Sequence, residues 1–169
     1  DPSICKRSLT QLFAHFKQQG VDYNQIWNQI KKMIILTCLP MTTLEPKTPH
    51  DNCFEVLGFD VMLDDKYNPW LIEVNYSPAL SIGGLMDQSI KEPLIEDTVN
   101  ILNLDADVQH EFTAHRVSRV NPPHSTLGNY EQIFPFNKAT RDAAANISAD
   151  KRPQENVARI VQEVGQMYP

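Results

Sequence analysis

Two short segments of strand composition, joined by a polar turn, restrict the fold of this 169-residue chain more than any other part of its sequence. Residues 53–63 and 69–75 are rich in β-branched and aromatic side chains, and the polar segment 64–68 separates them. This pattern predicts an antiparallel β-hairpin. If Asp64 lies opposite Pro69, then Asp60 lies opposite Glu73, and the alternation of side chains assigns every residue to one of two faces.

One predicted face of the hairpin is apolar throughout and is expected to pack against the core. Its residues are Phe59, Val61, Leu63, Trp70, Ile72 and Val74. On the other face Asp60 lies opposite Glu73, and Asn75 lies about 7 Å further along the strand. Met62 and Leu71 lie beside these acids and would form an apolar bed for a flat group such as a base.

The paired acids on this face suggest a metal site. Like charges directly opposite each other destabilise a strand pair, so Asp60 and Glu73 need a counter-charge. Two carboxylates and the amide oxygen of Asn75 are ligands that a hard divalent cation prefers. Magnesium holding the phosphates of a nucleotide is therefore the first hypothesis, and Gly58 is expected to leave room for the ligand. The alternative is a solvated face with scattered acids; a calcium loop at 64–68 lacks the EF-hand spacing.

Helices are expected on both sides of the hairpin. The first follows Ser8 and stops near Gly20; the second follows Asp22 and ends before Pro40. The second carries an apolar stripe of Ile26, Trp27, Ile30, Met33 and Ile34. Residues 40–52 are predicted to be a surface loop, 87–102 a helix and 103–136 irregular. Two more helices are expected at 137–149 and 154–167, the latter with one apolar face of Val157, Ile160, Val161 and Val164.

Composition and charge exclude several classes of function. The chain has 15 Lys and Arg against 21 Asp and Glu and contains no basic run, so nucleic acid is not an expected partner. No apolar stretch approaches the ~20 residues of a membrane span, so no membrane association is expected either. Cys5, Cys38 and Cys53 are widely spaced, which argues against a disulfide framework or a zinc site and favours a reducing compartment.

The hairpin sequence resembles that of a known family. Residues 53–64 contain Gly-Phe-Asp at 58–60, and residues 69–80 contain Glu-Val-Asn-Tyr-Ser-Pro at 73–78. Both strings, with their spacing, closely resemble the C-terminal signature of the tubulin–tyrosine-ligase-like enzymes, which are ATP-grasp ligases. The resemblance extends to 6–9, 27–30, 34–37 and 97–102. Residues 127–135 are less similar, and 137–169 resemble no family that we can name.

The resemblance implies an α+β fold, namely the C-terminal lobe of an ATP-grasp fold in which an antiparallel hairpin packs with helices. This lobe would span residues 1–104, and residues 105–169 would form an irregular and then helical extension. The family's phosphate-covering loop precedes the matched region, and the chain begins without methionine. We therefore expect a C-terminal part of a longer enzyme, inactive without its upstream part.

The resemblance also implies roles for individual residues. In this family the aspartate of the first string and the Glu and Asn of the second hold magnesium at the phosphates of ATP. The implied catalytic and metal-binding set is Asp60, Glu73 and Asn75. Leu71 joins them in the expected cofactor-binding set as a wall of the adenine pocket, with ordinary packing as its alternative. Family members use ATP to phosphorylate a carboxylate, and the amine of an amino acid then attacks the acylphosphate.

The expected function is that of an ATP- and magnesium-dependent ligase that adds an amino acid to tubulin. Glutamate is the expected amino acid, with glycine and tyrosine as alternatives. The expected partners are tubulin or microtubules, the free amino acid and the upstream part of the enzyme. The expected location is the cytoplasm, at the cytoskeleton, with the cilium and basal body included. The alternatives are a non-catalytic tubulin-binding module of the same fold and an ATP-grasp ligase for another acid.

Overall fold

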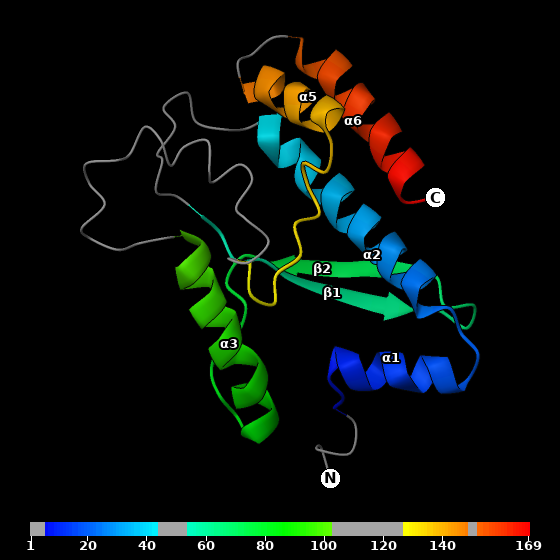
Figure 1. Cartoon of the computed structure of the whole chain (residues 1–169), viewed down its shortest axis with the longest axis vertical. Coiled ribbons are helices and arrows are strands. Elements are labelled where there is room, and N and C mark those ends of the chain that lie inside the picture. Colours follow the sequence, from blue (N-terminus) through cyan, green and yellow to red (C-terminus); the bar gives the residue numbers. More distant parts are fainter. Residues whose placement is uncertain (1–5, 44–53, 103–126, 149–151) are drawn as a thin grey trace. The chain divides into compact units, whose positions relative to one another are not determined.

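The structure is a computed structural model that describes residues 6–43, 54–102, 127–148 and 152–169 (Figure 1). The elements are α1 (Leu9–Gln18), α2 (Tyr23–Cys38), the 3₁₀ helix η2 (Leu39–Thr43), β1 (Gly58–Leu63), β2 (Pro69–Asn75), α3 (Leu85–Leu102), α5 (Lys138–Ser148) and α6 (Pro153–Met167). The two strands form one antiparallel sheet. The expected mixture of helices and an antiparallel hairpin is confirmed. The expected boundary between residues 104 and 105 lies outside the described residues.

The chain divides into two compact units. Residues 1–78 and 133–169 form the first unit, and residues 79–132 form the second. The first unit therefore contains the hairpin, α1, α2 and both C-terminal helices, whereas the second contains α3. Among the described residues, no helix combines the length and the apolar character needed to cross a membrane.

Side chains fix the starts of α1 and α2, as the sequence predicts. Ser8 and Gln11 form a reciprocal capping box, because the Gln11 backbone N–H donates to Ser8 Oγ (3.2 Å) and the Ser8 N–H donates to Gln11 Oε1 (3.0 Å). Asp22 caps α2 by accepting from the backbone N–H groups of Asn24 (3.0 Å) and Gln25 (3.4 Å). These bonds satisfy N–H groups that have no partner within the helix.

The loop predicted to begin at Pro40 is wrong over its first residues. Leu39–Thr43 continue α2 as a 3₁₀ helix, and residues 44–53 lie outside the described part of the chain. Pro40 has no N–H to donate, so the α-helical hydrogen bonds end at Leu39, whose N–H donates to the Ile35 carbonyl, and the chain continues as a 3₁₀ helix. Leu39 is buried (4% exposed), so packing favours the continued helix.

The core of the first unit joins the C-terminal helices to α2. Its buried members are Ile35, Leu39, Ala143, Ile147, Ile160, Val164 and Tyr168. The predicted apolar face of α6 is confirmed for Ile160 and Val164, which are fully buried, and for Val157, which packs against the cluster. It is wrong for Val161, which is 46% exposed, because α5 and α2 cover a narrower stripe of α6 than the sequence suggests.

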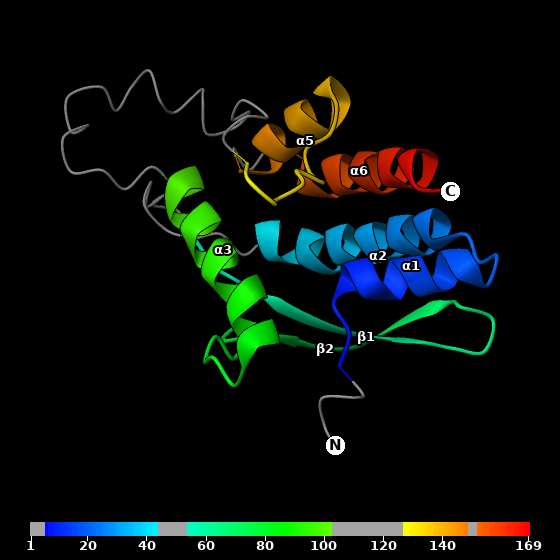
Figure 2. The same ribbon diagram turned by 60° about the horizontal axis from the view of Figure 1, so that its bottom comes forward.

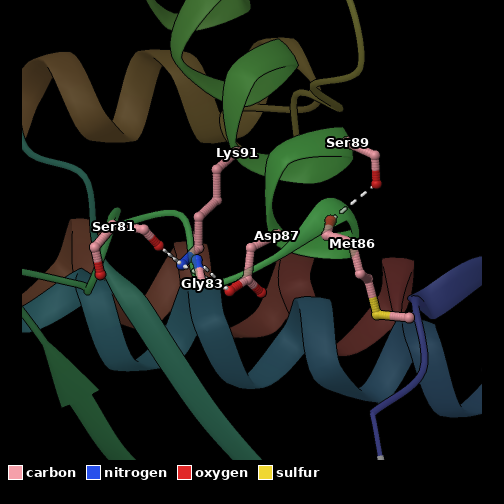
Figure 3. A network of polar contacts seen from close by, with 6 residues as sticks. All are labelled: Ser81, Gly83, Met86, Asp87, Ser89 and Lys91. Carbon is pink, nitrogen blue, oxygen red and sulfur yellow. Dashed lines mark hydrogen bonds and ion pairs between the residues drawn. The ribbon is translucent and has the colours of Figure 1, made fainter. Parts of the chain in front are cut away.

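The second unit begins with a loop that is bonded to the first turns of α3. Asp87 Oδ2 accepts from the Gly83 backbone N–H (3.1 Å), and Lys91 Nζ donates to the Ser81 carbonyl (2.6 Å), as Figure 3 shows. Asp87 and Lys91 also form an ion pair of 4.0 Å. The helix starts two residues earlier than predicted, at Leu85, and continues through Pro93. Asp87 lies in the first turn of α3, so its negative charge is at the positive end of the helix dipole.

A turn at 127–130 packs against α3 in the same unit. Asp97 Oδ2 accepts from the backbone N–H (2.8 Å) and the side-chain amide (2.9 Å) of Asn129. The hydroxyls of Thr98 and Tyr130 lie 2.7 Å apart. The predicted irregular conformation is confirmed for residues 127–136; residues 103–126 are outside the described part.

We predict that Gly128→Ala breaks the contact between this turn and α3. Gly128 has a φ of +56°, which alanine adopts at a cost of roughly 1–2 kcal/mol, and an added Cβ would collide with the Asp97 carboxylate. Asp97 must then move away from Asn129. Hydrogen exchange of the Asn129 amide should accelerate at least tenfold. Gly84→Ala is the control, because nothing lies within 4 Å of its Cβ position; equal exchange rates in both variants would contradict the prediction.

Candidate functional site

A β-bulge divides the hairpin into two registers. Gly58, Phe59 and Asp60 pair with Asn75, Val74 and Glu73, as the sequence predicts. Beyond the bulge, Val61, Met62 and Leu63 pair with Leu71, Trp70 and Pro69, so that Ile72 has no partner. The predicted pairing of Asp60 with Glu73 is therefore confirmed, and the predicted pairing near the turn is wrong by one residue.

The bulge exchanges the faces of the residues at the turn end of β2. Leu71 pairs with Val61 on the half-buried face, so the prediction that it shares a face with Glu73 is wrong. Trp70 pairs with Met62 on the acidic face, where both are about 60% exposed, and not on the core face as predicted. Ile72 was also expected in the core but is 57% exposed. An assignment of Leu71 to an adenine pocket beside the acids thus loses its geometric basis.

The acid pair and Asn75 form one hydrogen-bonded group. Asn75 Nδ2 donates to Glu73 Oε1 (3.0 Å) and to Asp60 Oδ2 (3.3 Å), and so lies between the two carboxylates. The bond from Asn75, followed by the interaction with Asp60, lowers the pKa of Glu73. All three residues come from strand positions that the observed register places on the same face. The structure thus brings together the three residues that the sequence indicated.

The donor set matches the preferences of a hard divalent cation. It consists of two carboxylates and an amide, and rotation of the Asn75 amide would present Oδ1 in place of Nδ2. Among the described residues no group of three or more His, Cys, Asp and Glu side chains is suited to a metal ion. With only three ligands from these side chains, a cation here would keep coordination positions for water or phosphate oxygens.

The predicted free space at Gly58 is occupied. A Cβ at this position would lie 3.0 Å from Pro78 Cβ and 3.7 Å from Asn75 Cβ. The glycine therefore allows the chain that leaves β2 to approach β1 closely, which is a common reason for glycine within a strand. The prediction that Gly58 leaves room for a ligand is wrong, because Pro78 fills that room.

The turn of the hairpin is held by one carboxylate. Asp64 Oδ1 accepts from the backbone N–H groups of Lys66 (2.9 Å) and Asn68 (2.8 Å), and Oδ2 accepts from Asn68 Nδ2 (3.0 Å) and the Trp70 indole (3.1 Å). The bonds from Asn68, aided by those from Trp70 and Lys66, lower the pKa of Asp64 to about 2. Sequence reasoning found the turn but not this network, although an Asp at the start of a turn is a recognised signal.

We predict that Asp64 makes the stability of the hairpin depend on pH. The pKa of Asp64 is lower in the folded chain than its ordinary value. The contribution of Asp64 to the free energy of unfolding is therefore complete above about pH 4 and decreases as the pH falls toward about 2. Urea unfolding at pH 5, 3 and 2 should show a stability difference between wild type and Asp64→Asn that shrinks with acidity. A difference that stays constant over this range would contradict the assignment.

The acid pair lies within a segment of the chain that matches a known protein family. The model of the "Tubulin-tyrosine ligase family" matches residues 1–111. A Mus musculus protein named probable tubulin polyglutamylase TTLL2 is 38% identical over 130 residues, which cover 77% of this chain and 24% of that protein. Tubulin polyglutamylase TTLL6 of Mus musculus is 37% identical over 108 residues, covering 59% of this chain and 13% of that protein.

A protein of a ciliate is also similar to this chain. The probable beta-tubulin polyglutamylase of Tetrahymena thermophila is 34% identical over 123 residues, which cover 66% of this chain and 10% of that protein. The chain belongs to the tubulin-tyrosine ligase family, because the family model covers more than half of its residues. It spans about a quarter or less of the length of these relatives.

Proposed function

We propose that this chain forms the metal-bearing part of an ATP- and magnesium-dependent ligase that attaches an amino acid to tubulin. The observation that carries the proposal is the group formed by Asp60, Glu73 and Asn75 within the part matched by the family model. The names of the relatives support glutamate as the amino acid, because they describe tubulin polyglutamylases. Action on tubulin further supports a location in the cytoplasm, at the cytoskeleton or in cilia.

In this proposal the three side chains hold the ion and orient the nucleotide. Asp60 and Glu73 supply negative charge, and Asn75 supplies a neutral oxygen after its amide has rotated. Bound Mg²⁺ would supply positive charge to the phosphates of ATP. The exposed position of both acids suits a site that is completed by another part of the enzyme and by the nucleotide. The contribution of the hairpin is thus positioning and electrostatics.

The ligation itself consists of two transfers at the substrates. The γ-phosphoryl group moves from ATP to a carboxylate oxygen of tubulin, which gives an acylphosphate and ADP. The amine of the free amino acid then attacks the carbonyl carbon, and phosphate leaves as the amide bond forms. Glycine and tyrosine contain the same α-amine, so the amine alone does not select glutamate.

Calorimetry of magnesium-dependent ATP binding tests the proposal. It should be done on this chain and on the complete product of its gene, each as wild type, Glu73→Gln and Asp65→Asn. Asp65 is an exposed acid in the turn of the same hairpin and is the matched control. We expect binding that is lost in Glu73→Gln and kept in Asp65→Asn, at least in the complete product. Absence of binding in every protein would favour a non-catalytic tubulin-binding module.

The amino acid is identified by a separate assay. The complete product is incubated with microtubules, ATP, magnesium and labelled glutamate, glycine or tyrosine. Incorporation of glutamate alone is the expected result. Incorporation of glycine or tyrosine instead would retain the ligase and correct its substrate.

A further inference from the structure

The C-terminal helices share a core with α2 although they lie beyond the part matched by the family model. That model ends at residue 111, whereas α5 begins at Lys138. Ile160, Val164 and Ala143 are fully buried (0% exposed) in the cluster that also contains Ile35 of α2. Burial of this depth is typical of the interior of a single folded unit.

Polar and aromatic contacts fix the helix pair α5–α6 in addition to the apolar core. Asn137 Oδ1 accepts from the Thr140 N–H (2.8 Å) at the start of α5, and Asn137 Nδ2 donates to Glu163 Oε2 of α6 (2.8 Å). Tyr168, just after α6, has its ring 6.0 Å from that of Phe136 and lies 5.6 Å from Lys31 Nζ of α2. The contacts of Asn137 and Phe136 thus hold α5 and α6 together, and the contact of Lys31 with Tyr168 joins the end of α6 to α2.

The opposite side of α2 contacts the hairpin and α1. Figure 2 shows α2 between α6 and the strands, and α2 contacts both α6 and β2. Phe13 of α1 packs on Tyr23 and Trp27 at the start of α2. Phe16 of α1 contacts Tyr67 in the turn of the hairpin (5.5 Å between ring centroids).

We propose that the helix pair α5–α6 is a positioning element for the acid pair. It holds α2, and α2 supports β2, on which Glu73 and Asn75 lie. An α-helix is stiff over the length of α2, roughly 24 Å at 1.5 Å per residue. Loosening the contacts of α2 with α5 and α6 should therefore also change how α2 supports β2. The role in metal binding rests on the proposed function, whereas the mechanical support of the hairpin does not.

Hydrogen exchange in the complete gene product tests the mechanical part. Ile160→Val removes one carbon from a fully buried position, whereas the control Val161→Ala removes two carbons at an exposed position. We expect Ile160→Val to accelerate exchange at the β1–β2 amides and the α6 amides by the same factor, about 3- to 10-fold. Val161→Ala should change both less than twofold. Acceleration confined to α5 and α6 would overturn the proposal.

Magnesium-dependent ATP binding tests the positioning part with the same variants at a temperature where each is folded. Ile160→Val should bind at least threefold more weakly than wild type, and Val161→Ala should bind as wild type does. Faster hairpin exchange with unchanged affinity would overturn the positioning role. If wild type binds no ATP, the proposed function fails, and the exchange comparison alone decides whether the extension supports the hairpin.

Discussion

Replacing Glu73 with glutamine should abolish most of the proposed ligase activity of the complete gene product and leave its folding intact. Loss of one electrostatic contact to charge that develops in a transition state typically lowers kcat by about 10²- to 10³-fold. The fold should be nearly unaffected, because Glu73 is exposed and glutamine keeps an Oε1 that can accept the bond from Asn75 Nδ2. Steady-state incorporation of amino acid into tubulin and the urea midpoint measure the two effects.

Two further variants show whether the effect belongs to the acid pair. Asp60→Asn should resemble Glu73→Gln in both measurements, since each removes one carboxylate from the group around Asn75. Asp65→Asn, in the same hairpin, should retain full activity. A comparable loss of activity and stability in Glu73→Gln would assign this residue a structural role instead.

Ile160→Ala should be the most destabilising single truncation that we consider. Ile160 is fully buried among α2, α5 and α6, and truncating a buried Ile to Ala costs about 2–5 kcal/mol through lost transfer free energy and the remaining cavity. Urea unfolding should show a reduced midpoint with little change in slope. Val161→Ala, one residue later and 46% exposed, should cost less than about 0.5 kcal/mol. Equal effects of both variants would contradict the observed packing of α6.

Local rules predicted the parts of the structure that depend on neighbouring residues. Capping residues marked the starts of α1 and α2, because Ser8 and Asp22 bond to N–H groups only two or three residues away. Strand composition and a polar turn predicted the hairpin. The pairing of Asp60 with Glu73 could also be predicted from the sequence, because the register at the end of the hairpin away from the turn has no irregularity.

The remaining features depend on contacts that no local pattern encodes. The bulge at Ile72 results from how the turn closes around Asp64, and nothing in the run from Trp70 to Val74 marks which residue lacks a partner. Periodicity predicted an apolar stripe on α6 but could not identify α2 as the surface that covers it. The bonds from Asn75 to both acids likewise depend on side-chain orientations across the two strands.

The bulge at Ile72 also determines which change of length the hairpin can accept. Deletion of Ile72 would make Leu71 and Glu73 neighbours, and the alternation of side chains would still place them on opposite faces, so every observed strand pair could remain. Deletion of a paired residue such as Val74 would instead turn its neighbours to the other face. A designer who transplants this hairpin into another scaffold can therefore omit Ile72 but must keep every paired residue of β2.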